Sequence, residues 1–184
     1  ITITGLNPDS QQGDKVILDI LKRCGGKFKG VEGGYHFDRS LLKATEIDLA
    51  DCPDLGPILF TLGCFCSGET VITNAGRLRL KESDRIEAMR DELQKMGARI
   101  EVDGDTVHIQ GVALHAPNAP LSGHNDHRIV MALAVAAIAS GLPALLCGAE
   151  AVDKSWPAFW NVLRGLGAKV ELSTDKTNEF DIKA

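Results

Sequence analysis

Four short clusters of charged residues have the side-chain types that bind and transform a multiply charged anion. Each cluster lies just before or at the start of an expected helix: Asp54, residues 81–85 (Lys-Glu-Ser-Asp-Arg), residues 125–128 (Asn-Asp-His-Arg) and Lys154-Ser155. A helix N-terminus has free N–H groups and the positive end of the helix dipole, so it favours anions. Cations are unfavourable there unless an anion neutralises them. We therefore predict that the lysines and arginines of these clusters bind an anionic ligand.

Each of these residues also has an ordinary structural interpretation. A single lysine or arginine more often forms a surface ion pair, and the opposite charges within residues 81–85 could neutralise each other. Asp54 and Asp126 are of the type that caps helices, and a lone His127 is more often a hydrogen-bonded structural residue. The functional interpretation depends on four clusters at equivalent helix boundaries, not on any one residue.

The equivalence comes from an internal repeat. Gly25 and Gly97 are 72 residues apart, Gly167 follows after another 70, and each ends a stretch with apolar residues at helical spacing. This pattern predicts a helix that is ended by a glycine cap. Two more helices are expected at residues 56–67 and 128–140. Strands are expected at residues 27–29, 35–37, 70–73, 99–102, 107–109, 144–147 and 169–172.

The unit is therefore helix, strand, strand, helix, strand. Two full copies and the start of a third predict pseudo-threefold packing within a single domain that spans residues 1–184. In that packing the helix starts lie on one rim, with Ser83 or Asp84 as N-cap of the helix near residue 86 and Ser155 as N-cap of the helix near residue 156. The charged clusters would then meet.

The composition fits a folded domain and disfavours some classes of function. The chain is 44% hydrophobic and 24% charged, which is enough to bury a core. Its net charge of −5 is opposite to that of most proteins that bind nucleic acid or anionic membranes. The five cysteines include no CxxC pair, so we expect no disulfide framework, no metal site and a cytoplasmic location.

Two features of the chain need a separate interpretation. Residues 129–149 carry no charge and are formally long enough to cross a bilayer, but Pro143 predicts a buried helix, a turn and a short strand instead. The chain begins Ile-Thr-Ile-Thr-Gly, as if inside a strand, with no Met, no basic n-region and no cleavable apolar segment at its start. This start indicates a mature product or, as we favour, an excised fragment.

Three motifs resemble signatures of the 5-enolpyruvylshikimate-3-phosphate synthase family. They are Lys-Glu-Ser-Asp-Arg-Ile at residues 81–86, Asn-Asp-His-Arg-Ile at residues 125–129 and Gly-Ala-Glu-Ala-Val-Asp-Lys-Ser-Trp-Pro at residues 148–157. Their order and spacing match those of the family. The resemblance implies an α/β fold of two similar domains, each an inside-out barrel of three βαβαββ units. This chain would be most of the C-terminal domain, without the second domain and without the N-terminal segment that supplies an active-site lysine.

The resemblance also implies the reaction. The family transfers the enolpyruvyl group of phosphoenolpyruvate to the 5-hydroxyl of shikimate 3-phosphate and releases phosphate, by addition and elimination, without a metal or cofactor. This is a step of chorismate and aromatic amino acid biosynthesis. Phosphoenolpyruvate carries a carboxylate and a phosphate, so Arg85 and Arg128 are expected to bind it bidentately. Lys154 is expected near the phosphate and bridging oxygen, where a proton is delivered to the leaving group.

The remaining roles are assigned by the same resemblance. Asp54 meets the shikimate hydroxyls and is the candidate base for the 5-hydroxyl, with Lys81 nearby. Glu82 is the candidate acid that protonates the methylene carbon. Both roles require a carboxyl pKa raised toward neutrality, which burial on domain closure could supply. Asp126 and His127 are expected to orient the arginine and the phosphate. In residues 76–80 (Gly-Arg-Leu-Arg-Leu) the sequence departs from the family, which often places an Asn-like shikimate contact there.

The expected partners are the two small-molecule substrates and the missing N-terminal half, with no nucleic acid and no membrane. Alone, the chain is expected to be inactive or nearly so, because catalysis needs both domains closed on the substrates. An alternative from another class is a non-catalytic anion-binding or scaffold domain that keeps the fold and the basic rim.

Overall fold

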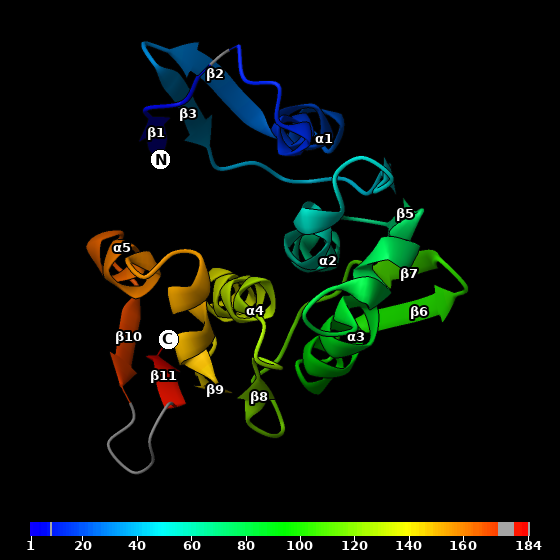
Figure 1. Cartoon of the computed structure of the whole chain (residues 1–184), viewed down its shortest axis with the longest axis vertical. Coiled ribbons are helices and arrows are strands. Elements are labelled where there is room, and N and C mark those ends of the chain that lie inside the picture. Colours follow the sequence, from blue (N-terminus) through cyan, green and yellow to red (C-terminus); the bar gives the residue numbers. More distant parts are fainter. Residues whose placement is uncertain (8, 173–178, 184) are drawn as a thin grey trace.

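Two copies of one structural unit follow each other along the chain, and a third begins (Figure 1). The computed structural model describes residues 1–7, 9–172 and 179–183. The first copy consists of α1 (Ile17–Arg23), β2 (Lys27–Val31), β3 (Gly34–Asp38), β4 (Glu46–Asp48), α2 (Gly56–Phe65) and β5 (Glu69–Thr73). The second consists of α3 (Arg85–Lys95), β6 (Arg99–Asp103), β7 (Thr106–Gln110), β8 (Leu121–Ser122), α4 (His127–Ser140) and β9 (Ala144–Cys147). The third contributes α5 (Phe159–Gly165), β10 (Lys169–Leu172) and β11 (Glu179–Lys183), and β1 (Thr2–Thr4) precedes the first copy.

The repeat predicted from the sequence is confirmed with one addition, a short strand before the second helix of each full copy. These strands, β4 and β8, have three and two residues, too few to show a period-two pattern. The glycines that end the helices behave as predicted. Gly25, Gly97 and Gly167 have φ angles of 82°, 86° and 96°, in the left-handed region that a side chain disfavours.

The sheets join consecutive copies. Two four-stranded sheets have the orders β4-β5-β7-β6 and β8-β9-β11-β10, so each combines the end of one copy with the hairpin of the next. In both sheets the short strand runs parallel to its neighbour, and the other pairs are antiparallel. The remaining sheet, β1-β3-β2, has the same hairpin. In the described residues no strand lies beside β1 in the place that β4 and β8 occupy.

The core lies between helices α2 and α4 and the sheets around them (Figure 1). Both helices are mostly apolar and buried on several sides, and Thr61 on α2 donates a hydrogen bond to the Ala132 carbonyl on α4 at 3.1 Å. Helices inside and sheets outside give the mixed α/β architecture predicted from the repeat. In the described part of the chain, no helix has the length and apolar character needed to cross a membrane.

The helix starts near the charged clusters are only partly as predicted. Asp84 caps α3, since its Oδ1 accepts hydrogen bonds from the N–H groups of Ile86 and Glu87 at 3.1 and 3.2 Å. The prediction that Ser155 caps a helix is wrong. Residues Ala149–Lys154 form a 3₁₀ helix, Ser155 ends it, and α5 begins only at Phe159 without a side-chain cap.

Candidate anion-binding site

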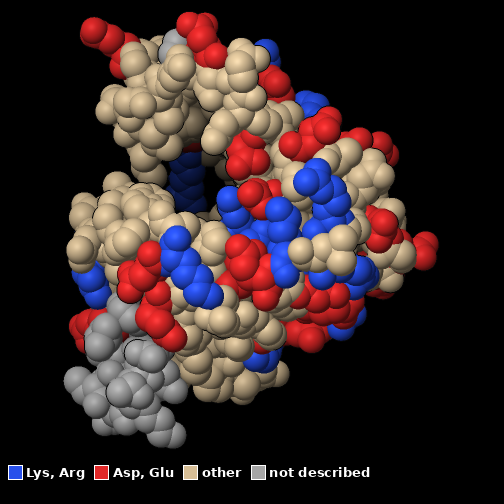
Figure 2. Space-filling view, viewed as in Figure 1, with Lys and Arg blue, Asp and Glu red and all other residues tan. Residues whose placement is uncertain are grey.

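The charged clusters meet at one edge of the molecule, which we call the rim. It consists of Asp54, Lys81, Glu82, Arg85, Asn125, Asp126, His127, Arg128 and Lys154, from the helix starts of different copies. Figure 2 shows acidic and basic side chains intermixed over the face that carries α2 and α3. The repeat therefore places together residues that are far apart in the sequence.

A buried ion pair lies at the centre of the rim. Arg85 is 1% exposed and Asp126 0%, and they form two hydrogen bonds, Nε to Oδ2 at 2.8 Å and Nη2 to Oδ1 at 3.2 Å. Burial alone would raise the pKa of Asp126, but hydrogen bonds from Arg85 and from the Arg128 N–H outweigh it, so this pKa lies below its ordinary value. Asp126 also caps α4 through the Arg128 N–H at 2.9 Å. The pair fixes α3 to the start of α4.

Asp54 lies between three cations from two parts of the chain. Its Oδ1 is 3.0 Å from Lys81 Nζ and 3.2 Å from Arg85 Nη1, and its Oδ2 accepts a hydrogen bond from Arg128 Nη2 at 3.0 Å. Partial burial raises the pKa of Asp54, but the three cations lower it more, and the net value is below the ordinary one. Asp54 is thus held as a carboxylate on a half-exposed surface.

Glu82 binds the same arginine from the exposed side of the pair. Arg85 Nη2 donates a hydrogen bond to Glu82 Oε2 at 2.6 Å. Three carboxylates, Asp54, Glu82 and Asp126, therefore surround the guanidinium, whereas the sequence predicted that Arg85 would offer a bidentate fork to a ligand. Because Arg85 is 1% exposed, we expect an anion to reach it by replacing Glu82 or Asp54, which are 45% and 37% exposed.

Lys154 is bound to the turn that precedes α4. Its Nζ donates hydrogen bonds to the Asn125 carbonyl oxygen at 2.5 Å and to Asn125 Oδ1 at 2.7 Å. Asn125 has a φ of +53°, in the left-handed region. Asn125 belonged to a predicted cluster but was not assigned a site role. An Asn directly before an N-cap residue could have indicated a turn with a left-handed backbone at this position, since Asn tolerates that region.

Ser83 and His127 also belong to the clusters, and they differ in their hydrogen bonds. Ser83 donates a hydrogen bond to Asp126 Oδ2 at 3.1 Å, a contact that the sequence did not predict. The His127 ring is 12% exposed, and its Nδ1 is 4.0 Å from Asp126 Oδ1 without a hydrogen bond. His127 is thus at the rim but is not held in a single orientation by a protein partner of that nitrogen.

The segment before Lys81 has a structural role. Ala75–Leu80 forms a 3₁₀ helix in which Arg77 donates to the Ala50 carbonyl and Arg79 donates to Asp84 and Glu87. Both arginines of the segment thus support neighbouring elements. Its last residue, Leu80, is 86% exposed beside Lys81.

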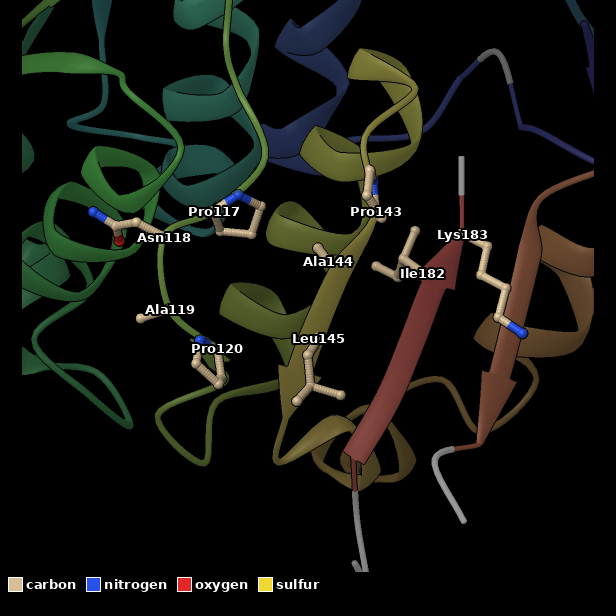
Figure 3. Close-up of a pocket in the computed structure, with 9 residues that line it drawn as sticks. All are labelled: Pro117, Asn118, Ala119, Pro120, Pro143, Ala144, Leu145, Ile182 and Lys183. Carbon is tan, nitrogen blue, oxygen red and sulfur yellow. The ribbon is translucent and has the colours of Figure 1, made fainter. Parts of the chain in front are cut away.

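The most prominent grooves lie away from the rim. One of about 470 Å³ lies beside β9 and β11 and is lined by Pro117 to Pro120, Pro143 to Leu145, Ile182 and Lys183 (Figure 3). Another of about 540 Å³ lies between residues 39–42, 64–67 and 111–113. Neither groove is lined by a residue of the rim. Among the described residues no cluster of His, Cys, Asp and Glu side chains could hold a metal ion.

The fold and the rim define a class of protein. Helices enclosed by sheets, in repeated units with cations and carboxylates at the helix starts, form the domain of an enolpyruvyl transferase. EPSP synthase from Acinetobacter baumannii has a similar structure, with a TM-score of 0.75 and 27% identity over 90% of this chain and 40% of that one. The enolpyruvyl transferase NikO from Streptomyces tendae shares the fold, with a TM-score of 0.71 and 22% identity over 85% of this chain and 36% of that one.

The chain belongs to the EPSP synthase (3-phosphoshikimate 1-carboxyvinyltransferase) family, whose sequence model matches residues 1–163. It is 44% identical over 176 residues to the 3-phosphoshikimate 1-carboxyvinyltransferase of Brachyspira hyodysenteriae, covering 92% of this chain and 40% of the relative. It is 41% identical over 178 residues to that of Methanocaldococcus jannaschii, covering 94% of this chain and 40% of the relative. The chain thus spans about two fifths of the length of these relatives.

Proposed function

We propose that this chain is the C-terminal part of an enzyme that transfers the enolpyruvyl group of phosphoenolpyruvate to the 5-hydroxyl of shikimate 3-phosphate and releases phosphate. One observation supports it most: in an acidic chain of this family, Lys81, Arg85 and Arg128 converge on the Asp54 carboxylate within 3.2 Å. A rim of this kind suits substrates that carry phosphate and carboxylate groups.

Phosphoenolpyruvate binds on this proposal between Arg128 and Lys154. Both have exposed or half-exposed side chains, and both now donate to oxygens that belong to the protein, Asp54 and Asn125. A substrate phosphate or carboxylate is a stronger acceptor than a neutral amide and competes for the same donors. Arg85 supports this arrangement from beneath and reaches the substrate when Glu82 or Asp54 moves away.

Proton transfer involves the two half-exposed carboxylates. Asp54, with its lowered pKa, is ionised at neutral pH and accepts the proton of the 5-hydroxyl. The neighbouring cations also make it a weak base. It becomes a stronger one when substrate anions draw Lys81 and Arg128 away. Glu82, the proposed acid, must first leave Arg85 and then gives a proton to the methylene carbon, which becomes a methyl group. When phosphate leaves, a proton returns from this methyl group to the Glu82 carboxylate, and the double bond of the enolpyruvyl group forms again. Asp126 and His127 orient Arg85 and the phosphate, and Lys154 delivers a proton to the leaving group.

The remainder of the relatives' length completes the domain. Within residues 1–7, 9–172 and 179–183, the sheet edge at β1 has no neighbour of the kind that β4 and β8 provide. A groove of about 370 Å³ beside it is lined by Ile3, Leu6 and Tyr35 among others. Ile3 and Leu6 are 45% and 44% exposed. Figure 2 shows a hollow between this sheet and the part of the molecule that carries α5. We propose that an N-terminal segment adds a strand beside β1 and a helix alongside α2 and α4, and that the second domain closes over the rim.

Complementation tests the proposal. The chain alone is expected to release no phosphate from the two substrates, and addition of the N-terminal portion of a relative is expected to restore release. The double variant Glu82→Ala, Lys154→Ala should abolish the restored activity, whereas the control Asp91→Ala, on the exposed side of α3, should not. Restored turnover that survives the double variant would refute the assigned roles. Binding of phosphoenolpyruvate without turnover would favour the anion-binding scaffold instead.

A further inference from the structure

A buried carboxylate outside the rim holds the turn that carries Asn125 and Asp126. Glu92, on the third turn of α3, is 3% exposed, which is rare for glutamate unless it is paired. Its Oε2 accepts hydrogen bonds from Lys95 Nζ at 2.7 Å and from the Ser122 N–H at 2.8 Å. Its Oε1 lies 3.0 Å from His124 Nε2. Both carboxylate oxygens therefore have partners. Two of the three contacts, those with Ser122 and His124, are made with the turn.

That turn has an unfavourable backbone. His124 and Asn125 have φ angles of +49° and +53°, and two consecutive residues other than glycine in this region are uncommon. Such a conformation persists only where the surroundings determine it. Here Lys95 also donates a hydrogen bond to the Pro120 carbonyl at 3.1 Å. The C-terminal end of α3 therefore binds the segment 120–124 at Pro120, at Ser122 and at His124. Glu92 contributes most of these attachments.

The turn presents groups to two cations of the rim. The Asn125 carbonyl and side chain bind Lys154, and the next residue, Asp126, binds Arg85 and begins α4. A backbone shift at 124–125 therefore changes the placement of Lys154 and Arg85 together. Neither cation contacts Glu92 in the described structure.

We infer that Glu92 is a positioning residue that holds the turn 122–125, and through it Lys154 and Arg85, in the geometry that binds phosphoenolpyruvate. The inference rests on the proposed function for the identity of the ligand. Glutamine at this position would keep the contacts, because its carbonyl oxygen can accept from Ser122 and Lys95 while its amide donates to the His124 ring. Alanine would keep none of them.

The experiment compares Glu92→Ala, Glu92→Gln and the control Asp91→Ala in the full-length protein of which this chain is a part. Glu92→Ala should raise KM for phosphoenolpyruvate about tenfold or more, since small misplacements of binding groups are costly, and should change KM for shikimate 3-phosphate less. Glu92→Gln should restore the KM, and Asp91→Ala should match the wild type. Hydrogen exchange of the Ser122 amide, which donates to Glu92, should be faster in Glu92→Ala only.

The outcomes separate the two ideas. Absence of turnover by the wild-type protein would refute the proposed function, whereas a wild-type KM for phosphoenolpyruvate in Glu92→Ala would refute the positioning role. So would unchanged exchange of the Ser122 amide, which needs no substrate. If Glu92→Ala does not fold, Glu92→Asp replaces it. The shorter carboxylate cannot reach all three partners and should shift the KM in the same direction.

Discussion

Replacement of Arg85 by methionine should destabilise the protein strongly at neutral pH and less in acid. The variant leaves Asp126 with no exposed surface and without its bidentate cation. Removal of one partner from a buried ion pair costs about 3–5 kcal/mol, a large part of the roughly 5–15 kcal/mol that stabilises a typical domain. The free energy of unfolding, measured by urea titration with circular dichroism, should fall by that amount at pH 7.

The pH dependence gives the sharper test. In the wild type the pKa of Asp126 is lowered, so its contribution to stability is present above its unfolded pKa and is lost as pH falls below about 4. In Arg85→Met, burial is no longer outweighed by the arginine and raises this pKa. The folded variant then binds a proton more readily than the unfolded chain. The difference in unfolding free energy between the wild type and Arg85→Met should therefore shrink as pH falls from 7 toward about 4.

Two controls make the result specific. Arg90→Met removes a half-buried arginine of the same helix that pairs with Glu87 and Asp91, and it should cost less than about 1 kcal/mol. The double variant Arg85→Met, Asp126→Asn removes the buried charge and should recover about 1–3 kcal/mol relative to Arg85→Met. A loss in Arg85→Met below about 1 kcal/mol, or one that does not vary with pH, would refute the buried ion pair as the centre of the rim.

Three further predictions follow from single contacts. Asp54→Asn should lower kcat for phosphate release about 10²- to 10⁴-fold in the full-length protein, because it removes the proposed base, and wild-type kcat would refute that role. Asp84→Ala removes the side-chain acceptor of two N–H groups of α3 and should lower the unfolding free energy by about 1 kcal/mol in the same urea titration. Burial raises the pKa of Cys64 and Cys66 to about 12, so at pH 8 iodoacetamide should alkylate these two thiols only when the protein unfolds. The half-buried Cys147 should be alkylated earlier, and mass spectrometry of the labelled peptides measures this order.

Much of the fold could be predicted because the repeat occurs in local patterns. Helical apolar spacing followed by a glycine located α3 to within one residue at either end, and the left-handed φ of Gly97 is the physical reason why the pattern works. Strands β4 and β8 were missed because their pairing is set by neighbouring strands and not by their own few residues. Ser155 was assigned wrongly because a 3₁₀ turn, which depends on tertiary packing, displaced the start of α5.

The members of the rim could be predicted, but their pairing could not. Helix starts at equivalent places in a repeat predict that the clusters approach each other. Which carboxylate meets which cation depends on the geometry of side chains that are far apart in the sequence. Arg85, for example, is separated from Asp54 by 31 positions and from Asp126 by 41. The supporting residue Glu92 carried no signal of its own, since a glutamate on an amphipathic helix is normally solvent-exposed.

The pairing changes how the rim can bind a ligand. Three cations, Lys81, Arg85 and Arg128, face three carboxylates, Asp54, Glu82 and Asp126, so little net positive charge is free among them. The fourth cation, Lys154, is bound to the neutral Asn125. An anion gains less by adding to such a cluster than by replacing one of its carboxylates. Asp126 is buried and bidentate and cannot be replaced, whereas Glu82 and Asp54 are half-exposed and can. Glu82 and Asp54 are also the residues for which we propose proton transfer. A substrate anion that displaces them would release each carboxylate from its cations at the moment when it is needed as an acid or a base.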